Sequence, residues 1–236
     1  MPTLRQFLNK ILTKEEIRSL IFIEVVSGIF LSITSLLLFL YLTRAVLNEQ
    51  TIIFDNSITN LVFSFRQFWL TKIMVLATTL GNQAIIVGSI IILIFLTKRK
   101  HRRESFIFSI LLLMGVVTTS LLKILLKVPR PQISALVIEN SYSYPSGHAL
   151  NALLFYGTIS FFIYHFTKNK KISLIVSILA TLLIFLIGLS RVYLGVHHPS
   201  DVLAGYIAGF WLFTTTIFVD KTIIFFRMIR ESSSES

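Results

Sequence analysis

Six long apolar runs are the feature that most constrains how this 236-residue chain can fold. Each run is long enough to cross the hydrocarbon core of a bilayer, which takes about 20 helical residues. The runs are Leu20–Leu47, Ile73–Thr97, Ser105–Leu122, Pro145–Phe166, Ile172–Leu189 and Val202–Val219. Backbone polar groups in lipid must pair within the segment, which favours helices for runs of this length. The sequence therefore predicts an all-α, polytopic membrane protein with six transmembrane helices in one bundle.

The composition agrees with a membrane location. Charged residues make up 14% of the chain, whereas a soluble domain carries roughly 25%. The formal charge of +11 comes from basic clusters in loops, so it gives no reason to expect a nucleic-acid partner. The chain has no cysteine, which excludes disulfides, thiolate nucleophiles and Cys-ligated metals. No small-residue cleavage site closes the first run, so we expect it to remain as an anchor.

The distribution of Lys and Arg predicts the orientation. With the N-terminus inside, fifteen of the 22 basic residues fall in inner segments and seven in outer segments. Basic residues concentrate in the cytoplasmic loops of helical membrane proteins. We therefore expect a multi-pass protein of the cell (plasma) membrane with both termini in the cytoplasm.

The segments between and outside the spans differ in character. Residues 1–19 mix apolar and basic positions, which fits either a short helix on the cytoplasmic surface or a frayed polar tail. Apolar and aromatic residues in Asn48–Leu70 recur every three or four positions, which predicts a surface helix in the outer interface between spans one and two. Gly81-Asn82-Gln83 interrupts the second run and is interpreted as a packing site. Residues 220–236 resemble a cytoplasmic polar tail with a disordered end.

This topology brings three polar segments to one face. Lys123–Pro131 ends the third span, Pro145–His148 begins the fourth, and Ser190–Asp201 joins the fifth to the sixth. A span missed or added would move one of them to the opposite surface. Titratable residues beside a membrane core are costly and mark functional sites. We therefore expect a site that faces the extracytoplasmic side.

The cations of these segments favour an anionic ligand. Lys123, Arg130 and Arg191 lie near one obvious acid, Asp201, and unpaired positive charge at the edge of an apolar bundle favours an anion. Arg suits bidentate phosphate binding, and Lys acts as a point charge.

The Pro145–His148 segment opens a helix, where free backbone N–H groups and the helix dipole also favour an anion. Gly147 allows a ligand to approach the backbone closely. Ser146 is a good N-cap in any case, but capping does not explain the adjoining Gly147 and His148.

Two imidazoles precede the sixth span. His197 and Asp201 are four residues apart and share a face if the chain is helical there. A carboxylate on one ring nitrogen would fix the tautomer and leave the other nitrogen free to attack. Asp201 could equally cap the sixth span after Pro199, and both roles can coexist. His198 is three residues from Asp201, and we interpret it as a spectator.

On these residues the chain resembles the type 2 phosphatidic acid phosphatase family, which shares its fold with vanadium-dependent haloperoxidases. The motifs of the family are Lys-x6-Arg-Pro, Pro-Ser-Gly-His and Ser-Arg-x5-His-x3-Asp. They match Lys123 with Arg130-Pro131, then Pro145–His148, and then Ser190-Arg191 with His197 and Asp201. The motifs keep the order and spacing of the family and cover about the last half of the chain.

The resemblance implies a metal-independent lipid phosphatase without a cofactor, formed by residues 20–219. His197 would be the nucleophile that forms a phosphohistidine, and Asp201 would orient it. His148 would protonate the leaving group and then activate water. The positions that correspond to the family's phosphate-binding residues are Lys123, Arg130, Ser146, Gly147 and Arg191.

Bacterial members of this family act on undecaprenyl pyrophosphate, phosphatidylglycerophosphate or lipid A. A site at the membrane surface fits a lipid phosphate, and we expect undecaprenyl pyrophosphate with broad activity. A lipid phosphotransferase with the same site is one alternative. A binding or transport protein that only holds an anion is another, and a haloperoxidase fits least because those relatives are soluble. The oligomeric state stays open.

Overall fold

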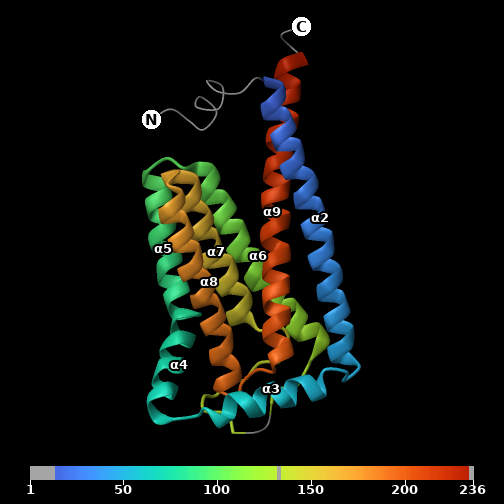
Figure 1. Cartoon of the computed structure of the whole chain (residues 1–236), viewed down its shortest axis with the longest axis vertical. Helices are drawn as coiled ribbons and strands as arrows, with labels where there is room; N and C mark the ends of the chain where they lie inside the picture. Colours follow the sequence, from blue (N-terminus) through green and yellow to red (C-terminus); the bar gives the residue numbers. More distant parts are fainter. Residues whose placement is uncertain (1–13, 132–133, 234–236) are drawn as a thin grey trace. The chain divides into compact units, whose positions relative to one another are not determined.

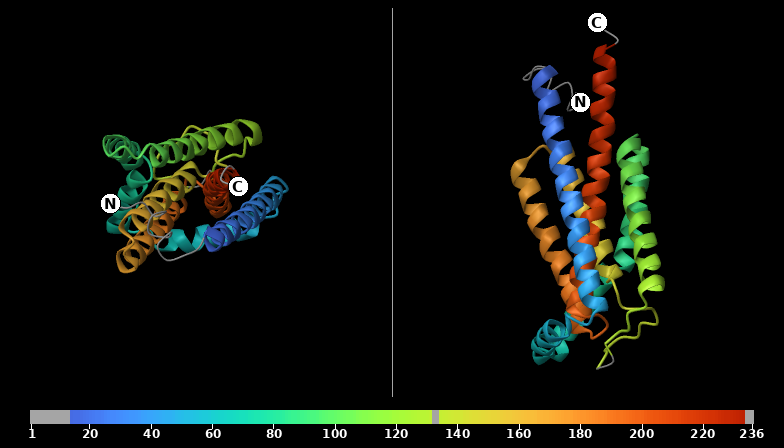
Figure 2. Two further views of the ribbon diagram at one scale, coloured as in Figure 1. Left: turned by 90° about the horizontal axis from the view of Figure 1, so that it is seen from above. Right: turned by 90° about the vertical axis from the view of Figure 1, so that its right-hand side faces the viewer.

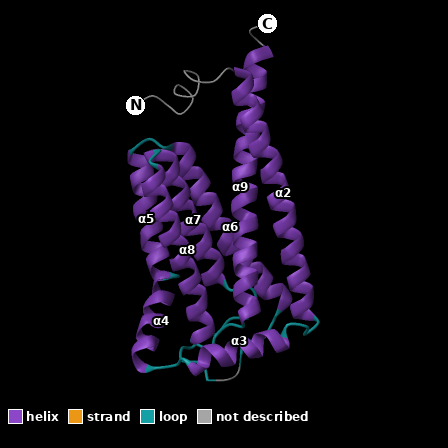
Figure 3. Ribbon diagram, viewed as in Figure 1, coloured by secondary structure: helices purple, strands orange, loops and turns teal. Residues whose placement is uncertain are grey.

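The computed structural model describes residues 14–131 and 134–233, which form helices and loops without a strand among them (Figures 1 and 3). The helices are α2 (Lys14–Leu47), α3 (Ile52–Ser64), α4 (Phe68–Leu80), α5 (Gln83–Lys98), α6 (Arg102–Leu126), α7 (Gly147–Thr167), α8 (Lys170–Tyr193) and α9 (Pro199–Ser233). Six helical segments are long and apolar enough to cross a membrane. The prediction of an all-α chain with six candidate spans is confirmed. Most of the surface helix predicted in residues 1–19 lies outside the described residues.

The candidate spans agree with the predicted runs and extend most of them by several residues. They run over Ser19–Leu47, Phe68–Lys98, Arg102–Leu126, Gly147–Thr167, Lys170–Tyr193 and Pro199–Met228. Apolar side chains on their outer faces are exposed, such as Leu113 at 62% and Leu182 at 60%. In contrast, Arg191 and Asp201 are 2% and 0% exposed. This inversion of the soluble pattern is what a lipid environment favours.

The second span is two helices instead of one. α4 ends at Leu80 and α5 begins at Gln83. A Cβ on Gly81 would lie 2.5 Å from Cγ2 of Ile187, so α8 approaches the backbone too closely for a side chain. The Tyr156 hydroxyl donates to the Leu80 carbonyl at 2.8 Å and so satisfies a group that the break leaves free. The packing role predicted for this segment agrees with these contacts.

The contacts divide the chain into two units. The described part of the smaller unit consists of residues 14–34 in α2 and residues 214–233 in α9. Nζ of Lys221 lies 2.6 Å from a Glu24 carboxylate oxygen there. The residues predicted as a polar tail continue α9 as far as Ser233, because this part of the helix has a partner against which to pack. The division of the chain into residues 1–19, 20–219 and 220–236 stays a prediction.

The larger unit, residues 35–213, contains α3 to α8 and the adjoining ends of α2 and α9. Leu150 of α7 belongs to the same buried cluster as Ala208 of α9. A Cβ on Gly205 would lie 2.6 Å from the Ser146 carbonyl oxygen, so α9 and the start of α7 are in close contact. The Ser146 N–H then donates to the Asp201 carbonyl at 3.0 Å. Close packing of these two helices therefore places their N-terminal ends side by side.

Helix α3 lies across the ends of the neighbouring helices of the larger unit, not alongside them (Figures 1 and 2). Its Asp55 is only 6% exposed, and its two carboxylate oxygens accept from the backbone N–H and the hydroxyl of Ser200, each at 2.8 Å. An anion at a helix N-terminus is stabilising. Asp55 thereby fixes the beginning of α9.

The helix predicted for Asn48–Leu70 is divided by a turn at Phe65–Gln67. Nε and Nη2 of Arg66 donate to the Tyr193 carbonyl at 2.9 and 2.6 Å, and the Gln67 N–H donates to the Tyr193 hydroxyl at 3.0 Å. The turn therefore binds the last residue of α8. Together with Asp55, it holds the ends of α8 and α9 in place.

Candidate active site

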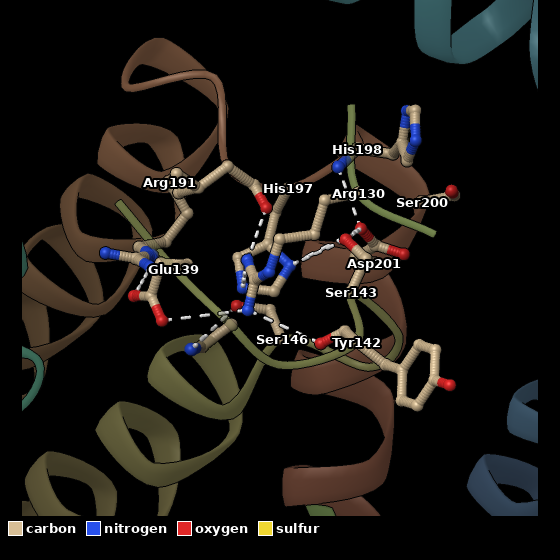
Figure 4. Close-up of polar contacts among 12 residues, drawn as sticks. Arg130, Glu139, Tyr142, Ser143, Ser146, Arg191, His197, His198, Ser200 and Asp201 are labelled. Atoms are coloured by element: carbon tan, nitrogen blue, oxygen red, sulfur yellow. Dashed lines mark hydrogen bonds and ion pairs between the residues drawn. The ribbon is translucent and has the colours of Figure 1, made fainter. Parts of the chain in front are cut away.

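The three polar motif segments meet at one end of the larger unit (Figure 4). Lys123 lies in the last turn of α6, Ser146 caps α7, Arg191 lies in the last turn of α8, and Asp201 lies in the first turn of α9. Arg130 comes from the loop between α6 and α7. The topology predicted this common face, and the structure places these residues on it.

The chain turns sharply between Arg191 and Asp201. α8 ends at Tyr193, and Gly195 has a φ of 76°, a conformation that suits glycine because it has no Cβ. A Cβ on Gly195 would also lie 3.0 Å from Nη2 of Arg66. The turn directs His197 into the protein, where it is 2% exposed.

The environment of His197 fixes its tautomer. Nε2 lies 3.4 Å from Nη1 of Arg130, and because a guanidinium can only donate, this contact suits an unprotonated Nε2. Nδ1 then carries the proton and faces Ser143 Oγ at 3.2 Å and Asp201 Oδ2 at 3.4 Å. Burial lowers the pKa of His197 to about 4, although Asp201 opposes this effect. The imidazole is therefore neutral at neutral pH, with its lone pair directed towards a cation.

Asp201 lies where it can take both of the roles that the sequence allowed. Its Oδ2 accepts from the His198 backbone N–H at 2.8 Å, which caps α9, and it also faces His197. Oδ2 accepts a further hydrogen bond from Ser143 Oγ at 2.5 Å. The ring of His198 points away from this cluster in Figure 4, as expected of a spectator.

The loop before α7 holds Arg130 and Lys123 in position. Nε of Arg130 donates to the Ser141 carbonyl at 2.6 Å, and Nη1 donates to the Val196 carbonyl at 2.5 Å. Ser141 Oγ accepts from Nη2 of Arg130 at 3.0 Å and from Nζ of Lys123 at 3.1 Å. Ser141 therefore joins two cations that the sequence placed 7 residues apart in one motif.

Glu139 bridges the two guanidinium groups. It forms an ion pair with Nη2 of Arg191, and Nη2 of Arg130 lies 3.7 Å from its other oxygen. Burial alone would raise the pKa of Glu139, but attraction to Arg191 and Arg130 outweighs burial and holds the pKa below its usual range. Nε of Arg191 is buried and has no hydrogen-bond partner among the described residues. Arg191 and Arg130 thus bind the Glu139 carboxylate together, and Nε of Arg191 remains as a donor without a partner among the described residues.

The start of α7 adds donors to the same face. Ser146 Oγ accepts from the Ala149 N–H at 3.5 Å, so its predicted role as an N-cap is confirmed. The nearest atom to a Cβ on Gly147 would be Thr119 Cγ2 at 3.8 Å, so the fold leaves space beside the Gly147 backbone. His148 follows as a half-buried residue within electrostatic reach of Arg191.

A cavity of about 740 Å³ adjoins these residues. Lys123, Arg130, Glu139 and Gly147 line its polar side, and Ile124 of α6 lines it as well. Ile124 is 62% exposed on the apolar surface of α6, so the cavity extends from the cations towards the side of the protein that suits lipid. Within residues 14–131 and 134–233, no group of three His, Asp or Glu side chains could hold a metal ion.

Sequence reasoning missed the contributions of Ser143, Glu139, Ser141 and Asp55. The acid in the loop was visible, and its position among three cations could have predicted an ion pair. Ser141 and Ser143 carry no comparable signal, because a hydroxyl in a loop is more often solvated than part of a site.

Comparisons with known proteins place these features in a family. The sequence pattern of the PAP2 superfamily matches residues 104–224. Phosphatidylglycerophosphatase B of Bacillus subtilis (strain 168) is 34% identical over 197 residues, which cover 81% of this chain and 95% of that protein. An undecaprenyl-diphosphatase of Sulfolobus acidocaldarius is 29% identical over 194 residues, which cover 79% of this chain and 90% of that protein.

Two solved structures are similar as well. The crystal structure of a transmembrane PAP2-type phosphatidylglycerolphosphate phosphatase from Bacillus subtilis has a TM-score of 0.75 at 30% identity, covering 81% of this chain and 96% of that chain. The crystal structure of Aquifex aeolicus LpxE has a TM-score of 0.54 at 25% identity, covering 70% of this chain and 93% of that chain.

Proposed function

This chain belongs to the PAP2 superfamily, and we propose that it is an integral-membrane lipid phosphatase that works through a phosphohistidine at His197. The observation that carries the proposal is a buried imidazole whose Nε2 faces Arg130, beside a cavity lined in part by Lys123 and Arg130. Phosphoryl transfer requires mainly positioning and fixed positive charge. The arrangement supplies both.

In the first step, Nε2 of His197 attacks the phosphorus of the lipid phosphate. The N–P bond forms while the bond from phosphorus to the leaving oxygen breaks, and His148 donates a proton to that oxygen. The leaving oxygen is the lipid oxygen of a monoester or the bridging oxygen of a pyrophosphate, so a pyrophosphate leaves the lipid monophosphate. Asp201 keeps the ring oriented through its contact with Nδ1. The groups that hold the phosphoryl oxygens are Lys123, Arg130, Arg191, the Ser146 hydroxyl and the Gly147 amide.

In the second step, His148 removes a proton from a water molecule, which attacks the phosphorus. The N–P bond breaks, inorganic phosphate leaves, and His197 returns to its neutral form. His148 is suited to this exchange because imidazole can act as acid and then as base near neutral pH. The three cations provide the charge stabilisation that other phosphatases obtain from metal ions, so we propose that the reaction needs no metal.

The proposed substrate is undecaprenyl pyrophosphate, with activity on other lipid phosphates. The cavity lies beside the exposed face of α6 and contains Ser120, Asn140 and Ser141, which could bind a second phosphoryl group. Phosphatidylglycerophosphate is the second candidate, because the relative with 34% identity is named for it.

The test is phosphate release by the purified protein in liposomes, with a panel of lipid phosphates, with and without EDTA. We expect release without a lipid acceptor, unaffected by EDTA, and fastest with the pyrophosphate. Loss of activity in EDTA would disprove metal independence, and a need for a lipid acceptor would indicate a phosphotransferase.

An acid-labile phosphoenzyme should form in the parent and in His198→Ala but not in His197→Ala. Label retained in His197→Ala would assign the nucleophile elsewhere.

We also propose that the site faces the extracytoplasmic side. Because the chain has no cysteine, single cysteines can report the orientation. In whole cells, a membrane-impermeant maleimide should label Ile138→Cys, because Ile138 is 92% exposed in the loop between α6 and α7. It should not label Arg99→Cys at the other end. The reverse labelling pattern would place the site in the cytoplasm.

A further inference from the structure

We infer that the Ser143 hydroxyl is a positioning group that links the His197 imidazole to Asp201 during phosphoryl transfer. The inference rests on the proposed phosphatase function, because it concerns how that reaction's nucleophile is held. Ser143 itself does not contact the substrate in this scheme.

The backbone holds Ser143 firmly beside the two residues that it links. Ser143 is 0% exposed, and its N–H donates to the Val128 carbonyl at 2.9 Å. This bond fixes the loop that leads into α7. Oγ lies 2.5 Å from Asp201 Oδ2 and 3.2 Å from His197 Nδ1. Figure 4 draws Ser143 in the same cluster as these two residues.

The available protons determine the direction of these bonds. An ionised carboxylate only accepts, so the single hydroxyl proton of Ser143 goes to Asp201 Oδ2. The lone pairs of Oγ are then free to accept from Nδ1–H of His197. The contact with Arg130 agrees with the same tautomer, because Nη1 lies 3.4 Å from Nε2 and can only donate. The contacts at Nδ1 and at Nε2 therefore both indicate the tautomer that carries its proton on Nδ1.

The direct contact between His197 and Asp201 is weaker than the path through Ser143. Nδ1 and Oδ2 are 3.4 Å apart, longer than either contact of Ser143 Oγ and beyond the usual range for a strong hydrogen bond. Oδ2 also accepts from the His198 N–H at 2.8 Å. The carboxylate oxygen is thus already shared, and the hydroxyl offers the better-placed acceptor for Nδ1–H.

This link matters when the ring becomes charged. As Nε2 bonds to phosphorus, the imidazole gains positive charge and Nδ1–H becomes a stronger donor. Ser143 Oγ accepts a hydrogen bond from Nδ1–H and donates its own hydroxyl proton in a hydrogen bond to Asp201. Neither proton is transferred: one stays on Nδ1 and the other on Oγ. The carboxylate therefore stabilises the phosphohistidine through the hydroxyl, and the ring cannot rotate away from phosphorus.

The first experiment is Ser143→Ala in the purified full-length protein. We expect kcat on a lipid phosphate to fall about 10- to 100-fold, less than the loss on removing a whole triad residue, because Asp201 remains nearby. KM and the inhibition constant for inorganic phosphate should change by less than about threefold, because the cations are untouched. Ser173→Ala is the matched control: Ser173 is 5% exposed in α8, and its Oγ has no hydrogen-bond partner among the described residues. That control should keep the parent kcat.

A double-mutant cycle separates positioning from structural support. Because Ser143 acts through Asp201, adding Ser143→Ala to Asp201→Asn should cost less than about threefold further. Additive losses would overturn the inference. Ser143→Thr keeps the hydroxyl and should recover part of the rate. If Ser143→Ala does not fold, Ser143→Cys takes its place, since it preserves the volume with a weak donor, and it should show the same fall in kcat.

The outcomes distinguish the two levels of the argument. A parent protein that releases no phosphate from any lipid phosphate would refute the proposed function. An active parent with an equally active Ser143→Ala, or with an equally active Ser143→Cys where the alanine variant does not fold, would refute only the role of Ser143.

Discussion

The two ends of the larger unit both carry clustered charge, but only one of them buries it. At the end opposite the candidate active site, the exposed basic residues of the α5–α6 and α7–α8 loops are Lys98, Arg99, Lys100, Arg102, Arg103, Lys168, Lys170 and Lys171. At the site, the Arg191 and Arg130 side chains are only 2% and 13% exposed. Glu139 pairs with both of them.

Burial therefore separates the two clusters of cations, whereas composition does not. Burying a cation costs several kcal/mol unless an anion compensates it. An exposed cation carries no such cost, so an exposed Lys or Arg can be exchanged with little effect on stability. Identical substitutions at the two ends should therefore have very different effects.

The largest difference is expected for arginine. Arg191→Ala should lower kcat/KM for a lipid phosphate about 10³-fold, because Arg191 is buried and, in the proposed mechanism, is a preorganised donor to the transition state. The kcat/KM of Arg99→Ala, a change at an exposed position, should stay within about twofold of the parent value. Phosphate-release kinetics on the two purified variants measure this. Equal losses would show that burial does not identify the functional cations.

Lysine should give a smaller difference in the same direction. Lys123→Gln keeps a donor for Ser141 Oγ but removes the charge, so we expect kcat/KM to fall about 10- to 100-fold. Lys98→Gln at the other end should leave the kinetics unchanged and affect at most the orientation in the membrane. A Lys123→Gln variant with the parent's kinetics would remove Lys123 from the proposed phosphate-binding residues.

Acidic residues near helix N-termini provide the third comparison. Asp55 is buried at the start of α9, whereas Glu104 lies in the first turn of α6, 3.8 Å from a partly exposed His101. Asp55→Ala should lower the melting temperature and cut kcat about tenfold, because two buried donors of Ser200 lose their acceptor and α9 carries Asp201. Asp55→Asn keeps an acceptor, so its melting temperature and kcat should lie between those of the parent and of Asp55→Ala. Glu104→Ala should match the parent in thermal unfolding and rate.

The spans and the common face of the motifs could be predicted from the sequence for a simple reason. Apolar length is set by bilayer thickness, and the number of spans decides which loops share a side. The break between α4 and α5 could not be predicted, because it depends on how closely Ile187 of α8 approaches the Gly81 backbone. The sequence around Gly81 does not indicate this tertiary contact. The continuation of α9 to Ser233 likewise depends on a partner segment from far away in the chain.

Within the site, the motif residues could be predicted, but their supporting contacts could not. Lys123 and His197 belong to spaced motifs, whereas Ser143 and Glu139 act through the path of a loop whose fold is fixed by tertiary contacts. Periodicity places Asp55 between the apolar positions of the helix predicted for Asn48–Leu70, but it does not say whether water or protein covers that polar face.

The smallest expected effect concerns Glu139, whose side chain is 29% exposed and which pairs with the site cations. Its carboxylate competes with phosphate for Arg191 and Arg130, so Glu139→Gln should lower the inhibition constant of inorganic phosphate about three- to tenfold, in keeping with a partly exposed ion pair of about 1 kcal/mol. Glu139→Asp keeps the charge and is the control. Attraction to both guanidiniums outweighs burial and holds the Glu139 pKa below its usual range, so the difference should persist from about pH 8 to about pH 5 and shrink as pH falls through the lowered pKa. Weaker phosphate inhibition of Glu139→Gln would mean that this carboxylate supports the cations instead of competing for them.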